Sequence, residues 1–213
     1  MSPTPSKLLS LLRLAFSILA GVAMAVQLHE SLTGKHFPVL NFFSFFTIQS
    51  NLLAVFILLV GALLPQRSSA APSWDLWRGA AVLYLSITGV VYGLLLSGYQ
   101  EALQTTIPWV DTVLHRLMPL LVVVDWLVDP PRRSEMSYAH CARRWAIYPL
   151  AYAAYALVRG PYAHWYPYPF LNPQTVGGYG VVAFYCLGIT VVTLLFSWLV
   201  VIVGRGCRLR IER

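Results

Sequence analysis

The chain has 213 residues, of which 58% are hydrophobic and only 11% are charged, and its mean hydropathy is +0.65. Soluble domains carry about 25% charged residues, so this composition excludes an ordinary soluble domain and indicates a polytopic membrane protein. The net charge of +7 would suit a nucleic-acid ligand. However, the basic residues cluster between apolar segments in a way that fits membrane topology, so no nucleic-acid partner is expected.

Six apolar segments follow one another along the chain, each close to the ~20 residues that cross ~30 Å of hydrocarbon. They cover residues 8–29, 41–64, 78–97, 109–128, 144–159 and 179–203. Because the connections are short, we expect an all-α fold, a polytopic membrane helical bundle of six transmembrane helices. Residues 1–213 would form a single transmembrane domain. The three cysteines have no CxxC or zinc-site spacing, so we expect free thiols.

The first segment also resembles a cleaved signal peptide, because Lys7 and Arg13 precede an apolar run and an Ala-Met-Ala sequence. Its apolar run is longer than the roughly 7–15 residues typical of a signal peptide. A retained first span is therefore favoured, with cleavage as the alternative.

The second segment begins with the stretch FFSFFTIQSNLL, where polar residues interrupt an apolar span. At 100° per residue, four of them fall within one arc of about 120°: Ser44, Thr47, Ser50 and Asn51. Such residues often bond to their own helix or join neighbouring helices. The functional alternative is that they form the polar wall of a pocket, with Thr47 about 9 Å below the outer boundary of the membrane.

The basic residues are distributed unevenly about the six segments. Twelve of the 15 Lys and Arg residues, including Arg13 and Arg78, lie on one side of a six-span arrangement. Only Lys35 and Arg159 lie on the other side, and Arg116 lies inside a span. By the positive-inside rule, both termini are expected to be cytoplasmic.

The fourth segment, WVDTVLHRLMPLLVVVDWL, places ionisable residues inside the membrane, where they are functional hypotheses by default. His115 lies about 9 Å below the outer boundary, at the depth of Thr47. A neutral imidazole can take the proton of a hydroxyl nucleophile, and Asp111, one turn away, can orient the ring. Ser50 or Asn51 could donate to an oxyanion. The catalytic candidates are therefore Thr47, His115 and Asp111, although His115 could instead be a structural hydrogen-bonding residue.

The fifth segment carries a polar stripe on one helical face: Tyr148, Tyr152, Tyr155 and Arg159. The planar guanidinium of Arg159 suits a lipid carboxylate or phosphate. The aromatic residues that follow, Trp165, Tyr166 and Tyr168, are typical of an interfacial aromatic belt. The candidate substrate-binding residues are Ser44, Ser50, Asn51, Tyr152, Tyr155 and Arg159.

Three stretches carry a family resemblance: FFSFFTIQSNLL, WVDTVLHRLMPLLVVVDWL and RGPYAHWYPYPFLN. Over nearly the whole chain they resemble uncharacterised bacterial six-span membrane proteins, which implies a bacterial cytoplasmic membrane location. That family is distantly similar to the animal androgen-induced and androgen-dependent TFPI-regulating membrane threonine hydrolases, which cleave fatty acid esters of hydroxy fatty acids. The resemblance implies Thr47 as nucleophile and His115 as the essential histidine. The chain departs from the animal pattern at Asp111.

The leading hypothesis is an integral membrane hydrolase that cleaves a lipid ester, such as a fatty acid ester of a hydroxy fatty acid. Membrane lipids and an acyl-chain substrate would be its partners, without a cofactor. One alternative is a small transporter or channel, with Asp111, His115 and Asp125 lining a pathway. Another is a non-catalytic lipid-binding membrane protein.

Metal-dependent chemistry is a further alternative, since histidine is a common metal ligand. Four histidines are expected on or near the outer side: His29, His36, His115 and His164. Their spacing matches no metal-binding motif, so no metal is expected.

Overall fold

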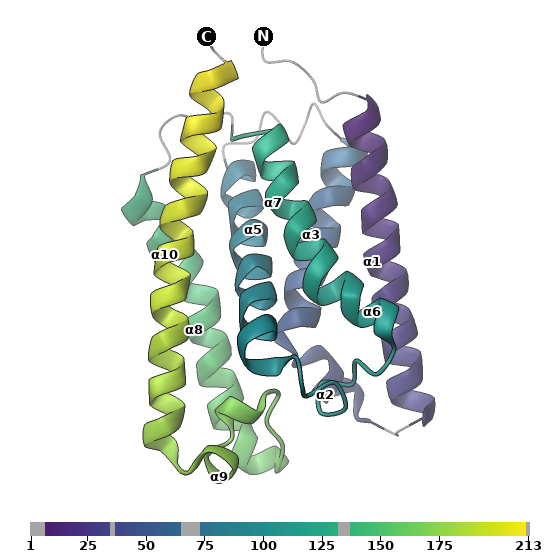
Figure 1. Ribbon diagram of the computed structural model, residues 1–213, viewed down its shortest axis with the longest axis vertical. Helices are drawn as coiled ribbons and strands as arrows, with labels where there is room; N and C mark the ends of the chain where they lie inside the picture. The colour runs from purple at the N-terminus through teal and green to yellow at the C-terminus, as the bar shows by residue number, and fades with distance from the viewer. Residues whose placement is uncertain (1–6, 35–36, 65–72, 132–136, 212–213) are drawn as a thin grey trace.

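A computed structural model describes residues 7–34, 37–64, 73–131 and 137–211, and every regular element in these ranges is helical (Figure 1). The α-helices are α1 (Lys7–Gly34), α2 (Val39–Phe43), α3 (Phe46–Leu63), α5 (Trp74–Val91), α6 (Pro108–Thr112), α7 (Met118–Val128), α8 (Tyr138–Ala163), α9 (Pro173–Val176) and α10 (Tyr179–Ile211). Two π-helical turns, η1 (Tyr92–Leu96) and η2 (Val113–Leu117), and the 3₁₀-helix η3 (Pro169–Leu171) complete the described elements.

These elements form a bundle of long helical segments that alternate in direction (Figure 1). The start of α1 and the end of α10 lie at one end of the bundle, which we call the terminal end. The turns between α1 and α3, between η1 and α6, and between α8 and α10 lie at the other, which we call the distal end.

Four helices in the described part of the chain are long and apolar enough to cross a membrane. They are Lys7–Thr33, Phe46–Leu63, Trp74–Leu96 and Tyr179–Cys207. A helical protein with several candidate membrane spans is thereby confirmed. The other two expected spans correspond to residues 108–128 and to α8, which are not among these four helices.

The second expected span, residues 41–64, is not one continuous helix. After α2 the helix is interrupted at Ser44 and Phe45, and Phe45 has an extended conformation with φ −72° and ψ 129°. The Phe45 side chain is only 2% exposed and packs against the rings of Phe37 and Trp165 at 6.1 and 5.5 Å. Tertiary packing thus overrides local helix preference, and Thr47 lies in the first turn of α3.

A buried ion network joins α1, α5 and α7 at the terminal end. Arg13 contacts Asp125 at 2.6 Å and Asp129 at 2.7 Å. Arg78 contacts Asp125 at 3.2 Å and donates to the main-chain oxygen of Asp129 at 2.5 Å. Both arginines are only 5% exposed. Two of the basic residues assigned to the cytoplasmic side are therefore buried structural partners of acidic residues.

The middle of the bundle is apolar, with buried side chains such as Leu58, Leu83, Met118 and Val122. The polar side chains considered next lie toward the distal end, separated from the ion network by this apolar layer. The interior thus has two polar ends.

Candidate functional site

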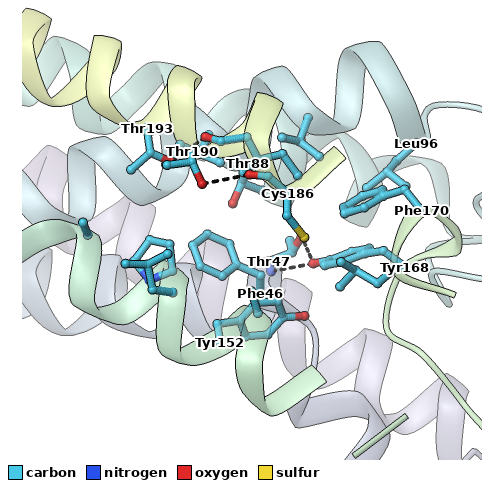
Figure 2. A pocket seen from close by; sticks show the side chains of 18 of the residues that line it. Phe46, Thr47, Thr88, Leu96, Tyr152, Tyr168, Phe170, Cys186, Thr190 and Thr193 are labelled. Atoms are coloured by element: carbon cyan, nitrogen blue, oxygen red, sulfur yellow. Dashed lines mark hydrogen bonds between the residues drawn. The ribbon is translucent and has the colours of Figure 1, made fainter. Parts of the chain in front are cut away.

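A cavity of about 130 Å³ extends from the distal end toward the middle of the bundle, between α3, α5, α8 and α10 (Figure 2). Most of its wall is apolar. Its polar side chains are Thr47, Thr88, Tyr152, Tyr168, Cys186, Thr190 and Thr193.

The Thr47 hydroxyl differs from the other threonine hydroxyls of this cavity. Thr88, Thr190 and Thr193 each donate to the main-chain oxygen four residues earlier, at 2.8–3.0 Å. This bond to the helix's own backbone is the usual state of threonine in membrane helices. Among the described residues, Thr47 Oγ1 makes no such bond and lies 3.5 Å from Tyr168 Oη. The Thr47 hydroxyl is therefore held toward the cavity rather than toward its helix.

Tyr168 reaches the start of α3 from the chain that follows α8 (Figure 2). Its Oη accepts the main-chain N–H of Thr47 at 3.2 Å. The first N–H groups of a helix have no intrahelical acceptor, so this bond caps α3. Burial raises the pKa of Tyr168, so its phenol stays neutral and can also donate.

The interfacial-belt interpretation is wrong for Tyr168, which is only 5% exposed and lines the cavity. Its ring stacks on Phe170 at 5.3 Å. The sequence signal for an inward-facing Tyr168 was its position between two prolines, because prolines restrict the backbone conformation of the loop.

His115 and Asp111 form a buried pair in α6 and η2, as their one-turn spacing suggests. His115 Nδ1 lies 3.1 Å from Asp111 Oδ1 and 3.2 Å from the Asp111 main-chain oxygen. Only the contact with the main-chain oxygen has hydrogen-bond geometry, and within the described chain Asp111 Oδ1 has no hydrogen-bond partner. A proton on Nδ1 that points at the main-chain oxygen would leave the lone pair of Nε2 free. Within the described chain, Nε2 has no hydrogen-bond partner. In that tautomer, Nε2 would be the proton acceptor that a general base needs.

Sequence reasoning missed Tyr92, which completes this pair. Tyr92 Oη donates to Asp111 Oδ2 at 2.6 Å, and its ring stacks on His115 with centroids 4.1 Å apart at 18°. Its only sequence signal was a single tyrosine within the apolar run VVYGLLL.

Asn51 connects the backbone of Thr47 to that of η2. Its Nδ2 donates to the Thr47 oxygen at 2.9 Å and to the oxygen of Leu114, the residue before His115, at 3.2 Å. No hydrogen bond joins Thr47 to His115 among the described residues, and His115 does not line the cavity. The two candidate catalytic residues are thus on adjacent packed elements without direct contact.

Ser50 and Asn51 were also candidate oxyanion donors. Ser50 Oγ bonds to the Thr47 oxygen and to Thr88 Oγ1, each at 3.1 Å. Since Asn51 Nδ2 already donates to two carbonyls, these two side chains join helices. The Asn51 Oδ1 atom is buried and has no hydrogen-bond partner within the described chain.

The polar stripe of α8 binds the broken segment. Each of its members hydrogen-bonds to α2, to the break or to the start of α3: Tyr148 to Gln49, Tyr152 to the Ser44 oxygen at 2.9 Å, Tyr155 to Ser44 Oγ at 2.7 Å, and Arg159 to Asn41 Oδ1 at 2.5 Å. Of the candidate substrate-binding residues, only Tyr152 lines the cavity. The stripe therefore holds the break in place.

His36 lies outside the described residues. Within the described chain, no three His, Cys, Asp or Glu residues gather closely enough to hold a metal ion.

No protein-family model, curated protein or solved structure matches the chain. The family resemblance therefore rests on the three quoted stretches alone.

Proposed function

We propose that the protein is a membrane-embedded hydrolase that cleaves a lipid ester with Thr47 as nucleophile. The observation that carries the proposal is the unusual state of the Thr47 hydroxyl. It faces an apolar cavity beside Tyr168 without bonding to its own helix, whereas three other threonines in the cavity do.

In this reaction Thr47 Oγ attacks the ester carbonyl and loses its proton to a base. The alcohol leaves with that proton, and the acyl group stays on Thr47 until water releases the fatty acid and restores the hydroxyl. A hydroxyl is a poor nucleophile without a base to take its proton.

His115 is the proposed base. Support comes from the hydrogen bond between His115 Nδ1 and the main-chain oxygen of Asp111 at 3.2 Å, because a proton on Nδ1 leaves Nε2 as the acceptor. Further support comes from Asn51, which joins the backbones of Thr47 and of Leu114, the neighbour of His115. Catalytic hydrogen bonds are often long or unformed without substrate and tighten once it binds, so the missing Thr47–His115 bond is compatible with this role.

Developing negative charge on the carbonyl oxygen would be stabilised at the start of α3. This helix has 18 residues, and its N-terminal N–H groups carry partial positive charge. The neutral Tyr168 hydroxyl, next to Thr47, would add a second donor.

The proposal is tested by hydrolysis of fluorogenic acyl esters by the protein in nanodiscs. We expect turnover by wild type and its loss in folded Thr47→Ala and His115→Ala variants. Thr190→Ala is a matched control, because Thr190 lines the same cavity but bonds to its own helix. Full turnover in folded Thr47→Ala would overturn the mechanism.

A non-catalytic lipid-binding protein is the second candidate, because the apolar cavity itself is suited to an acyl chain. The same assay separates the two, since a binding protein retains probe without turnover. A transport pathway is less favoured, because its candidate residue Asp125 is paired with Arg13 and Arg78, beyond an apolar layer.

We also propose that residues 1–213 form one transmembrane domain of six helices, with both termini in the cytoplasm of a bacterium. Support comes from the alternating direction of the long segments (Figure 1). It also comes from the exposed basic residues Lys7, Arg143 and Arg144 on helices at the terminal end.

A further inference from the structure

The chemistry of the cavity wall restricts which ligands can enter the cavity. Binding of such a ligand does not depend on the proposed hydrolase, whereas its reaction does. Every residue that lines the cavity is uncharged. Arg159, at the end of the α8 stripe, does not line it. Its guanidinium is held by Asn41 Oδ1 at 2.5 Å and lies 5.5 Å from the centre of the Trp165 ring.

A charged group inside this cavity would therefore lose its water without gaining an ionic partner. Burial of an unpaired charge is strongly unfavourable, whereas an ester carbonyl needs only one or two hydrogen-bond donors. The available polar groups are hydroxyls and the Cys186 thiol, and the hydroxyls of Thr47 and Tyr168 do not bond to a helix carbonyl.

Two lining residues indicate an opening of the cavity on the side of the bundle. Leu150 of α8 and Leu194 of α10 both line the cavity, yet they are 57% and 41% exposed on the outer surface. Each lies near the middle of its long helix. In a bilayer, this part of the bundle is surrounded by hydrocarbon, so the opening faces lipid chains rather than water.

The two hydroxyls that do not bond to a helix carbonyl lie at one end of the cavity. Thr47 and Tyr168, at its distal end, are only 7% and 5% exposed, whereas the opening is formed by leucines. A ligand with one ester and one long chain would match this order.

We infer that the cavity takes an uncharged acyl ester from the membrane, through the opening between Leu150 and Leu194. The ester carbonyl meets Thr47 and Tyr168, and the acyl chain extends toward the lipid. A substrate that also bears a carboxylate must keep that group outside the cavity.

Photolabelling tests this inference without requiring turnover. Two probes share one diazirine-bearing alkyl chain, one ending in a methyl ester and the other in a permanently charged sulfonate. After illumination in nanodiscs, labelled peptides are identified by mass spectrometry. We expect the ester probe to label the cavity-facing parts of α8 and α10 at least several-fold more than the sulfonate probe. Equal labelling of these sites by both probes would overturn the inference.

A pair of variants tests the route. Leu150→Trp fills the opening, whereas Ile147→Trp is the matched control, because Ile147 is 62% exposed on the same helix but does not line the cavity. We expect labelling inside the cavity to fall several-fold in folded Leu150→Trp and to stay unchanged in Ile147→Trp. Equal labelling in the two variants would exclude this entrance.

The photolabelling result can be distinguished from the result of the ester hydrolysis assay. Selective labelling by the ester probe without hydrolysis of any ester would support the binding site and contradict the hydrolase. Hydrolysis that depends on Thr47, with no preference between the two probes, would support the hydrolase and contradict the uncharged-ester site.

Discussion

Tyr168 Oη contacts two groups of Thr47, the main-chain N–H at 3.2 Å and Oγ1 at 3.5 Å. Tyr168→Phe keeps the ring, which stacks on Phe170, and removes only the hydroxyl. Since loss of one oxyanion donor costs about 10²–10³ in kcat, we expect turnover to fall by about that factor. KM should change little. Stability should fall by about 1–3 kcal/mol, because the Thr47 N–H loses its acceptor.

The matched control is Tyr155→Phe, since Tyr155 bonds to Ser44 and does not line the cavity. Ester turnover measured on folded protein should be near normal in this control. Tyr168→Phe with unchanged kcat would remove Tyr168 from the reaction and leave it as a helix cap.

The Asp111 carboxylate lies 3.1 Å from His115 Nδ1, where its negative charge would favour a proton on that nitrogen. In Asp111→Asn the amide can still face Tyr92, but it no longer provides a carboxylate for His115 Nδ1–H. A base held in the wrong tautomer loses activity even when the geometry survives, so we expect kcat to fall by about 10²-fold or more. Thr112→Val, at an exposed neighbouring position, should retain activity. An Asp111→Asn protein with normal kcat would contradict the proposed role.

The spacing of residues along one helix made part of this site predictable. A separation of four residues places Asp111 against His115 and puts the hydroxyl and amide residues of the second segment on an inward face. Tyr92 and Tyr168 were not predictable in this way, because their partners lie 19 and 121 residues away in the sequence. Only the tertiary fold brings these groups together.

The break between α2 and α3 changes the environment of Thr47 more than any local feature of the sequence suggests. Neither proline nor glycine lies at Ser44 or Phe45, the usual signals for a broken helix. The cause is the aromatic cluster around Phe45, which includes rings from before α2 and after α8. Hydropathy alone therefore predicted the span but not its interruption.

The cluster that holds this break can be tested by truncating Phe45. Loss of a fully buried phenylalanine costs about 3–5 kcal/mol, so we expect Phe45→Ala to be destabilised by that amount. Phe56→Ala is the matched control on α3, because Phe56 is 59% exposed, and it should change stability much less. Reversible unfolding in detergent measures both. Equal stability of the two variants would show that the Phe45 cluster does not hold the break.

The ion network at the terminal end fixes α1 against α5 and α7. In Arg13→Met, Asp125 and Asp129 keep only Arg78 as an arginine partner among the contacts described. Removing one member of a buried ion pair costs about 3–5 kcal/mol, and we expect a loss of that size in detergent unfolding. A double change, Arg13→Met with Asp125→Leu, should recover part of the loss. If the double variant is no more stable than Arg13→Met, the two residues are not coupled.

The whole molecule has an asymmetric interior, with ionic contacts at one end, hydroxyl and imidazole groups at the other and an apolar layer between them. The apolar segments predicted the long helices of this molecule but not the ion network, because each span's hydropathy depends only on local composition. The number of crossings depends also on the charged segments 108–128 and α8, whose charges are partly satisfied by partners on other helices. Composition alone does not identify those partners.

The orientation of this asymmetric interior decides which leaflet supplies the ligand. With the terminal end in the cytoplasm, Tyr99 at the distal end should be outside, and Lys7 inside. We would introduce Tyr99→Cys or Lys7→Cys into a variant without the three native cysteines and treat intact cells with a membrane-impermeant maleimide. Labelling is expected at position 99, which is 49% exposed, and at position 7 only after the cells are opened. The reverse pattern would move the Thr47 end of the cavity to the cytoplasmic leaflet, since both features belong to one bundle.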